Sequence, residues 1–317
     1  DDQSCLDWTG QFEELIDTSI HGEKLFSPYE MYIKTLDFMY GELLKNDREI
    51  THLSSKTLQG FQERSVKQLL WRLEKNGVAM LADSVGLGKT ITAIGVMKQY
   101  YGKRIIVIAP KSLGGQWDTE IAREQLLGIT VVSLQNKNEI EEEQKKDRYL
   151  PVSLFVIDES HNLRSQKSKR FDQVKDWVMN NENADTLLLT ATPVNNSIDD
   201  LTNQILIGTR GDQDLLKVNI RNSEGVVQSR SFFDALLEIK KKISQNRARG
   251  NDMKPIYEEA RQIIDPILRE FVIRNTRQSI EKELEGKELV IDGKSFTFPK
   301  IKVSNVDFFQ EITTVLS

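Results

Sequence analysis

Residues 82–90, Ala-Asp-Ser-Val-Gly-Leu-Gly-Lys-Thr, have the types and spacing that bind the phosphate groups of a nucleotide. They lie between an apolar run and a segment of helical pattern, and the backbone N–H groups of such a strand-to-helix turn attract anions. Gly86 and Gly88 carry no Cβ and let the backbone come close to the phosphates. Lys89 supplies a point charge for the β and γ phosphates, and Thr90 supplies a hydroxyl group for Mg²⁺. The stretch therefore predicts a phosphate-binding loop.

Asp83 departs from the full phosphate-loop pattern, which has a glycine five residues before Gly88. A glycine-containing turn that only caps a helix is therefore an alternative interpretation of this stretch. The choice between the two depends on whether a matching magnesium site follows farther along the chain, because a nucleotide is bound together with its metal ion.

Two adjacent acids, Asp158 and Glu159, end a second apolar run. Near-continuous apolar runs are typical of buried parallel strands, whose carboxyl ends lie where open α/β sheets bind ligands. Asp158 is then placed to hold Mg²⁺ through its water shell, and Glu159 to orient or polarise the attacking water. Such a pair by itself is usually a solvated strand end. After a phosphate loop it predicts a magnesium site for phosphoryl transfer.

A third run, residues 186–193, again has the pattern of a strand followed by a turn. With the two motifs above, it resembles motifs I, II and III of superfamily 2 helicases, and in detail their Swi/Snf-like branch. That branch has Asp-x-x-Gly-Leu-Gly-Lys-Thr, which accounts for Asp83 and implies that Asp83 takes part in nucleotide binding. It also has Leu-Thr-Ala-Thr-Pro-x-x-Asn-Ser-x-x-Asp-Leu, which residues 189–201 match.

Further segments fit the same family. Residues 60–63 resemble the Q motif, which implies that Gln62 reads the adenine edge. Residues 105–113 resemble motif Ia, which implies that Lys111 and Ser112 grip a nucleic-acid backbone. Such a contact needs only a cation and a hydroxyl or N–H group. An ordinary solvated loop is the alternative for these two residues.

The resemblance continues to the end of the chain and covers residues 57–310. Residues 271–277 resemble the family's Arg-Arg-Thr-Arg stretch, with Asn275 in place of the second arginine. Residues 298–300, Phe-Pro-Lys, resemble the segment that leads to a second motor lobe. The polar stretch at residues 136–148 does not match motif Ib of the family.

Three side chains beside these motifs are candidates for coupling the nucleotide to nucleic acid. The resemblance implies that His161 hydrogen-bonds between motifs, and that Thr190 and Thr192 link the γ-phosphate to the nucleic-acid side. The alternative is structural for all three. His161 would then stabilise a turn, and the two hydroxyl groups would bond to the backbone of their own turn.

The composition excludes several other classes of protein. The 317 residues include one cysteine, and neither it nor the three histidines form a zinc-ligand pattern, so no disulfide framework or zinc site is expected. No apolar run is long enough to cross a bilayer, and the chain does not begin with a signal-peptide pattern. The net charge of −5 argues against a basic DNA-coating protein but allows a local basic groove.

The order of the apolar runs predicts the fold class. Five short apolar runs alternate with helical patterns, which is typical of a parallel sheet with helices on both faces. The predicted strands are residues 78–81, 104–109, 130–134, 154–157 and 186–189. We predict an α/β fold, a RecA-like parallel sheet of the P-loop NTPase type, with a helical insertion added. The predicted parts are an N-terminal accessory segment, mostly helical (1–56), the ATP-binding lobe (57–208), the helical insertion (209–298) and the start of a connection to a second lobe (299–317).

Helical patterns are assigned to residues 58–75, 231–246 and 255–271. The last two lie in the predicted insertion, which the resemblance places after motif III. Residues 211–230 are polar and are predicted to form a loop.

The resemblance implies the first motor lobe of an ATP-dependent translocase, with ATP and Mg²⁺ as cofactors and duplex DNA as the partner. A second RecA-like lobe of the same parent chain would supply an arginine finger. The lobe alone is therefore expected to bind nucleotide weakly and to hydrolyse it very slowly. The helical insertion could bind protein partners, and no membrane is implied.

Two alternatives of different kinds stay open. The chain could belong to a single-strand or RNA helicase, or to the motor subunit of a restriction or phage-defence system. It could instead be a scaffold without motor activity, in which ATP switches the binding of a protein. The acidic composition with one cysteine favours a bacterial-type cytoplasmic member over a nuclear remodeller.

Overall fold

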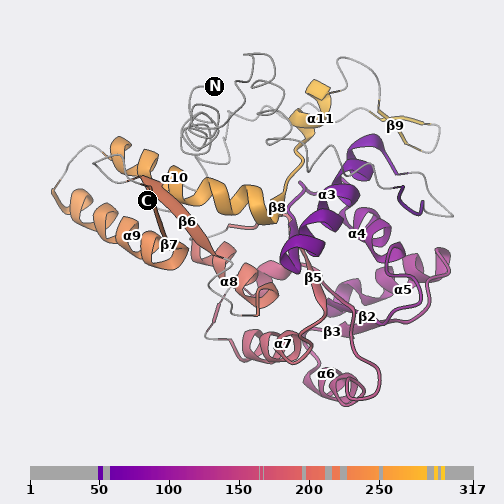
Figure 1. Ribbon diagram of the computed structural model, residues 1–317. Coiled ribbons are helices and arrows are strands. Elements are labelled where there is room, and N and C mark those ends of the chain that lie inside the picture. The colour runs from indigo at the N-terminus through magenta and orange to yellow at the C-terminus, as the bar shows by residue number, and fades with distance from the viewer. Residues whose placement is uncertain are drawn as a thin grey trace, which may run out of the picture. The chain divides into compact units, whose positions relative to one another are not determined.

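The computed structural model describes residues 49–52, 58–163, 165–166, 168–194, 198–210, 216–221, 227–249, 253–283, 289–291 and 294–296 (Figure 1). The chain divides into two units, Asp1–Glu49 with Arg221–Gln228, and Ile50–Ile220 with Ser229–Ser317. Nearly all described residues lie in the second unit, and its fold is given below. The predicted accessory segment, apart from residues 49–52, and the predicted connection at residues 299–317 lie outside the described residues.

A six-stranded sheet forms the centre of the second unit, in the order β3-β2-β4-β5-β1-β8, and its neighbouring strands are all parallel. Every residue of β1, β2 and β4 is buried, as strands covered on both faces require. The sheet confirms the predicted α/β fold. Its strands are β1 (Val78–Leu81), β2 (Ile105–Ala109), β3 (Ile129–Ser133), β4 (Leu154–Ile157), β5 (Asp185–Leu189) and β8 (Val272–Ile273).

Helices cover both faces of this sheet (Figure 1). On one face lie α3 (Gly60–Asn76), α4 (Lys89–Lys98) and α5 (Gly114–Arg123). On the other face lie α6 (Lys137–Gln144), α7 (Lys169–Met179) and α8 (Ile198–Gly208). This arrangement is the RecA-like lobe that the sequence predicted.

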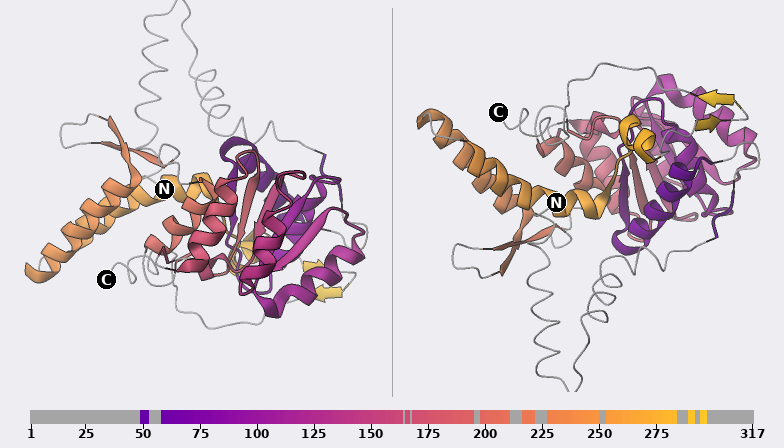
Figure 2. Two further views of the ribbon diagram at one scale, coloured as in Figure 1. Left: turned by 90° about the horizontal axis from the view of Figure 1, so that it is seen from below. Right: turned by 90° about the horizontal axis from the view of Figure 1, so that it is seen from above.

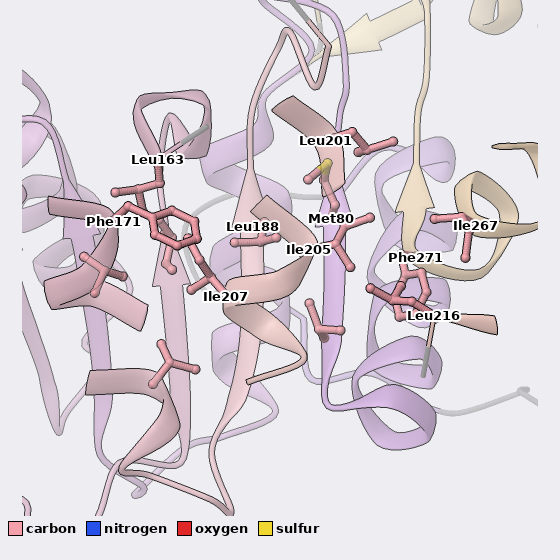
Figure 3. Close-up of a cluster of buried hydrophobic side chains, with 14 of the residues drawn as sticks. Met80, Leu163, Phe171, Leu188, Leu201, Ile205, Ile207, Leu216, Ile267 and Phe271 are labelled. Atoms are coloured by element: carbon pink, nitrogen blue, oxygen red, sulfur yellow. The ribbon is translucent and has the colours of Figure 1, made fainter. Parts of the chain in front are cut away.

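Side chains of each strand point alternately to the two faces. In β1, Met80 belongs to one buried cluster and Leu81 to the other. The Met80 cluster gathers side chains from β5, α7 and α8 and continues to Phe271 (Figure 3). The Leu81 cluster gathers the apolar stripe of α3, whose members recur at helical spacing. Burial on both faces therefore holds β1, and with it the residues that follow β1, in a rigid place.

The α3 helix packs closely against α4 at Gly95. A Cβ added at Gly95 would lie 2.8 Å from Val66 Cγ2, so only glycine allows the two helices to come this close. The apolar stripe of α3 includes Val66, Leu69 and Leu73, all buried. Contact with α4 places α3 beside the helix that begins at Lys89.

Beyond α8 the chain forms a strand pair and two long helices. The strands β6 (Lys217–Arg221) and β7 (Val227–Ser231) pair with each other, so the prediction that residues 211–230 form only a loop was wrong. The helices α9 (Phe232–Arg249) and α10 (Lys254–Phe271) confirm the two predicted helices and lie side by side (Figure 2). Lys242 of α9 forms an ion pair with Glu259 of α10.

The segment after α10 returns to the sheet. Phe271 ends α10, and β8 follows at once and pairs with β1 through Met80↔Val272 and Leu81↔Ile273. The predicted limits of the lobe (57–208) and of the insertion (209–298) stay a prediction, but one strand of the sheet comes from within the second range. After β8 follow α11 (Arg277–Glu283) and the antiparallel pair β9 (Leu289–Ile291) and β10 (Lys294–Phe296). In the part of the chain that the structure describes, no helix is long and apolar enough to cross a membrane.

The polar stretch at residues 136–148 is ordered by a buried ion network. It forms α6, capped by the Asn136 side chain, which accepts a hydrogen bond from Glu139 N. Arg104 Nη1 donates to Asp147 Oδ1 over 2.7 Å, and the Arg104 side chain is almost fully buried. The other oxygen, Asp147 Oδ2, accepts from Trp177 Nε1 over 2.7 Å and from Asn181 Nδ2 over 2.8 Å.

We expect Asp147→Ala to lower the free energy of unfolding by about 3–5 kcal/mol, because it removes one of the two carboxylates that pair with buried Arg104 and also leaves Trp177 Nε1 without its acceptor. Urea unfolding followed by circular dichroism measures this loss. Glu142→Ala is the matched control, since Glu142 pairs with Lys145 on the exposed side of α6 and should change stability little. Equal effects of the two substitutions would show that the network does not stabilise the fold.

Candidate nucleotide site

The chain leaves the sheet at its carboxyl edge after each strand, because all six strands are parallel. This edge is where open α/β sheets bind ligands. The segments that follow β1, β2, β4, β5 and β8 are residues 82–88, 110–113, 158–159, 190–194 and 274–276. All the predicted site residues except Gln62 therefore lie on or directly after one edge of the sheet.

The loop after β1 has the shape that its glycines allow. Gly86 and Gly88 have φ values of 87° and 79°, in the region that favours glycine. A Cβ added at Gly88 would lie 2.7 Å from Gln62 Nε2, so packing also requires glycine there. Lys89 begins α4, and Thr90 lies in the first turn of the helix. The N-terminal end of α4 carries the free N–H groups and partial positive charge that attract phosphate.

Gln62 joins α3 to this loop. Its side chain is buried, its Nε2 donates a hydrogen bond to Leu87 O over 3.1 Å, and its Oε1 accepts one from Gln59 N over 3.0 Å. The amide group of Gln62 thus supports the loop backbone directly. Its contact with adenine stays a prediction.

Lys89 and Asp83 meet at the base of the loop. Lys89 Nζ donates a hydrogen bond to the main-chain oxygen of Asp83 over 2.9 Å. The Asp83 carboxyl group, which we had expected to take part in nucleotide binding, is fully buried and accepts from Asn275 N over 2.7 Å and from Asn275 Nδ2 over 2.9 Å. Burial raises the pKa of Asp83 to about 6, against the opposing effects of the Asn275 bonds and of the Lys89 and Arg274 charges.

Asp158 follows β4 and is buried, with both carboxylate oxygens engaged. Its Oδ1 accepts from Glu159 N over 2.8 Å, and its Oδ2 accepts from Trp117 Nε1 over 2.9 Å. Burial raises the pKa of Asp158, while the two bonds and the nearby charge of Lys89 act in the opposite direction. Because the charge of Lys89 acts on Asp158, the structure brings the predicted phosphate and magnesium residues together.

Glu159 has an unusual backbone for its residue type. Its φ is 48°, a left-handed conformation that side chains other than glycine rarely adopt. The conformation is stabilised by Asn162, whose N and Nδ2 both donate to Glu159 O over 2.9 Å. The carboxylate is partly exposed, and its Oε2 lies 3.1 Å from His161 Nδ1. Strain of this kind persists where surrounding structure imposes it, and it is common at functional sites.

The two predicted coupling threonines lie directly after β5. Thr190 N bonds to Leu81 O over 3.1 Å, which joins this segment to the end of β1. Thr190 is buried, and its Oγ1 accepts from Thr192 N over 3.1 Å. This is the hydroxyl-to-backbone bond that the structural alternative describes. A role of Thr190 and Thr192 in coupling the nucleotide to nucleic acid stays a prediction.

Lys111 and Ser112 lie in η1 (Lys111–Leu113), the short helix after β2, and both are exposed. Lys111 lines a cavity of about 460 Å³ beside the start of α5, whose wall includes Gly114, Gly115 and Ser133. The cavity also has acidic lining residues, Asp118 and Glu139. The placement of Lys111 and Ser112 is compatible with a backbone contact, which stays a prediction.

Trp117 does more than the sequence indicated. It is buried in the cluster around Leu81. Its indole N–H also fixes Asp158. The sequence signal is a tryptophan near the start of the helix that follows β2, and its bond to Asp158 depends on the pairing of β2 with β4.

Gln204 of α8 was not identified from the sequence. It is fully buried, accepts from Ser160 Oγ over 2.6 Å and donates to Pro193 O over 3.0 Å and to Asp200 O over 2.7 Å. It therefore links the segment after Glu159 to the segment after Thr192. The available signal is a glutamine at helical spacing between Leu201 and Ile207, on the buried face of α8.

Comparisons with known proteins agree with this geometry. The family model described as SNF2-related domain matches residues 61–151 and 125–292. An uncharacterized ATP-dependent helicase of Bacillus subtilis, YqhH, is 33% identical over 147 residues, which are 41% of this chain and 26% of that protein. The ATP-dependent DNA helicase DDM1 of Arabidopsis thaliana is 27% identical over 272 residues, which are 75% of this chain and 33% of that protein.

Among solved structures, the SWI2/SNF2 ATPase core of Sulfolobus solfataricus in complex with dsDNA has a TM-score of 0.48 and 21% identity. It covers 73% of this chain, and this chain covers 46% of it. The matches span about a quarter to a third of the length of the two relatives above. The family model spans well over half of the chain. The chain therefore belongs to the SNF2-related family, in the Swi/Snf-like branch of the superfamily 2 helicase-type ATPases.

Proposed function

We propose that this chain is the N-terminal motor lobe of an ATP-dependent translocase that moves on duplex DNA. The observation that carries the proposal is that Lys89, in the segment after β1, and the buried, doubly hydrogen-bonded Asp158, directly after β4, lie at the same carboxyl edge of the sheet. A loop cation beside a carboxylate is what a phosphate group and its metal ion require. DNA as the partner is supported by a relative named as a DNA helicase. Duplex DNA in particular is what the resemblance to the Swi/Snf-like branch implies.

The residues at this edge fit a nucleotide with Mg²⁺. Mg²⁺ prefers hard oxygen ligands and keeps part of its water shell, and the Thr90 hydroxyl and the Asp158 carboxylate would hold it. When bound, the metal ion neutralises charge on the phosphates during transfer. Gly86 and Gly88 leave room for phosphate oxygens beside the backbone N–H groups. The part of the chain that the structure describes contains no cluster of three or more His, Cys, Asp or Glu side chains that could form a metal site by itself.

Each of the remaining site residues has a role in the proposed mechanism. Lys89 neutralises the β and γ phosphates, and Gln62 holds the loop through Leu87 O and reads the adenine edge. Glu159 takes the proton of the attacking water, and His161 Nδ1 lies 3.1 Å from its Oε2. General base catalysis of this kind contributes about 10²–10⁴-fold.

Nucleic acid would contact the exposed residues Lys111 and Ser112. Thr190 and Thr192 would couple the presence of the γ-phosphate to the binding of nucleic acid at that surface. Closure of a second lobe on this edge would complete the site. An arginine finger from that lobe is worth on the order of 10³–10⁵ in rate, so this lobe alone is expected to hydrolyse ATP very slowly.

The ATPase rate of the full-length protein tests the proposal. It is measured without nucleic acid and with duplex DNA, single-stranded DNA or RNA, with Lys89→Ala as the inactive control. Strong stimulation by duplex DNA is expected. Stimulation only by single strands or RNA would make the protein an unwinding helicase. No stimulation, with protein binding at α9 and α10 that depends on ATP, would make it a switched scaffold.

Trp117→Phe is expected to raise the Mg²⁺ concentration for half-maximal ATPase activity about tenfold. The indole N–H stabilises the ionised form of Asp158, so its loss raises the pKa of that carboxyl group further and weakens metal binding as the pH falls. Magnesium titrations at two pH values measure the shift. Trp177→Phe is the matched control, because it removes the same kind of bond, to Asp147, away from the site. Identical titrations for the Trp117 variant and the native protein would contradict the assignment.

A further inference from the structure

The segment after β8 lies along the first half of the phosphate loop, although the two are far apart in sequence. Two main-chain amides of the loop donate to main-chain oxygens of this segment, and one guanidinium of the segment donates back to the loop. These bonds are Ala82 N to Ile273 O (2.7 Å), Ser84 N to Asn275 O (3.1 Å) and Arg277 Nη2 to Val85 O (3.2 Å). The loop is thus bonded on one side to residues 273–277.

Asn275 is at the centre of this contact. Its main-chain N and its Nδ2 both donate to Asp83 Oδ1, across a sequence separation of 192 residues. The same Nδ2 also donates to Ser65 Oγ on α3 over 2.9 Å. Asp83 is fully buried, and its Oδ2 has no hydrogen-bond partner among the described residues. A carboxylate in such surroundings depends on the donors it has, because hydrogen bonds to a charged group are strong where water is excluded.

Asp83 in turn contacts the residue that would bind phosphate. Its main-chain oxygen accepts the hydrogen bond of Lys89 Nζ. Because the carboxyl group is held at Oδ1, the main chain of Asp83, and with it this oxygen, cannot shift far without breaking both bonds. Asn275 therefore acts on Lys89 through Asp83, without lying among the phosphate-binding residues.

We propose that Asn275 is a positioning residue of the nucleotide site, which sets ATP affinity by holding Asp83 and the start of the phosphate loop. The inference rests on the proposed binding of ATP at this loop. It also connects α10 to the nucleotide site through the chain, because α10 ends at Phe271, directly before β8 and Asn275. A displacement of α10 along its axis would move the donors of Asp83.

The affinity of the full-length protein for a fluorescent ATP analogue tests the proposal. Asn275→Ala is expected to weaken binding about 10- to 100-fold, the equivalent of losing a hydrogen bond to a charged group. Asn181→Ala is the matched control, because Asn181 Nδ2 also donates to an aspartate, Asp147, over 2.8 Å and lies away from the site. It should lower the melting temperature and leave the affinity unchanged. An Asn275→Ala affinity within twofold of the native value would overturn the proposal.

A reciprocal exchange separates positioning from loss of stability. Asn275→Asp sets a second carboxylate against Asp83 and should weaken binding more than Asn275→Ala. The double variant Asp83→Asn with Asn275→Asp restores an amide–carboxylate pair and should recover most of the affinity. Recovery of the melting temperature without recovery of the affinity would show that the pair serves stability alone, which would overturn the proposal.

Hydrogen exchange in the native protein gives a measurement that needs no variant. The Ser84 amide bonds to Asn275 O, so its exchange should slow when the ATP analogue binds. Unchanged exchange with the analogue bound would count against the proposal. A native protein that did not bind the analogue at all would instead refute the proposed function. Binding that Lys89→Ala abolishes but Asn275→Ala does not change would refute only the role of Asn275.

Discussion

Glu159→Gln is expected to lower the ATPase rate by about 10²–10⁴-fold while ATP affinity stays within about twofold of the native value. Glutamine has nearly the shape of glutamate but cannot take a proton from the attacking water. The left-handed backbone of residue 159 and the neighbouring His161 would hold the amide where the carboxylate was. Single-turnover hydrolysis with saturating DNA measures the rate, and titration with a fluorescent ATP analogue measures the affinity.

The comparison with Glu142→Gln controls for the loss of one carboxylate. Glu142 lies on α6 and pairs with Lys145 on the surface, so this variant should hydrolyse ATP at the native rate. Unimpaired hydrolysis by Glu159→Gln would remove Glu159 as the residue that activates water. A loss of ATP affinity as large as the loss of rate would show that Glu159 serves binding rather than the chemical step.

Lys89→Ala is expected to weaken ATP binding on the order of 100-fold, since it removes the charge that faces the phosphates in a partly buried site. The substitution also removes a positive charge that lowers the pKa values of Asp83 and Asp158. Both carboxyl groups should then hold their protons to higher pH, and magnesium binding should fall further. Equilibrium titration with the ATP analogue, with and without Mg²⁺, measures both effects.

Lys98→Ala provides the matched control within the same helix. Lys98 lies in the last turn of α4 and pairs with Glu124 over 3.2 Å, away from the phosphate loop. It should change stability and leave nucleotide affinity as it is. If the Lys89 variant bound ATP as tightly as the native protein, the assignment of residues 82–90 to phosphate binding would be wrong.

The apolar runs and their order were sufficient to predict the lobe. The five predicted strands of the sheet are observed, since a fully buried parallel strand leaves a continuous apolar run in the sequence. The glycine pattern of residues 82–90 likewise predicted a phosphate-binding loop, and in the structure Gly86 and Gly88 have positive φ values, which favour glycine. These are local properties, and they need no knowledge of distant contacts.

The sixth strand could not be predicted in this way. Val272 and Ile273 form a two-residue strand, too short for a periodic pattern, and pairing with β1 is what makes it a strand. The strands β6 and β7 were assigned to a loop for another reason, because residues 211–230 are polar as a whole. The β6 sequence, Lys-Val-Asn-Ile-Arg, does alternate polar and apolar residues, which is a strand signal, whereas the β7 sequence, Val-Gln-Ser-Arg-Ser, has no such alternation.

The sequence by itself determined the types and order of the reacting groups: a loop with Lys89 and Thr90, then Asp158 and Glu159 at the end of a later strand. Only the tertiary structure decided which side chains hold them, with Trp117 on Asp158, Gln204 on Ser160 and Asn275 on Asp83. The physical reason is the separation along the sequence between the residues that interact. Strand and turn formation depends on neighbouring residues, whereas a hydrogen bond between residues 83 and 275 exists only because the parallel sheet brings the ends of β1 and β8 together.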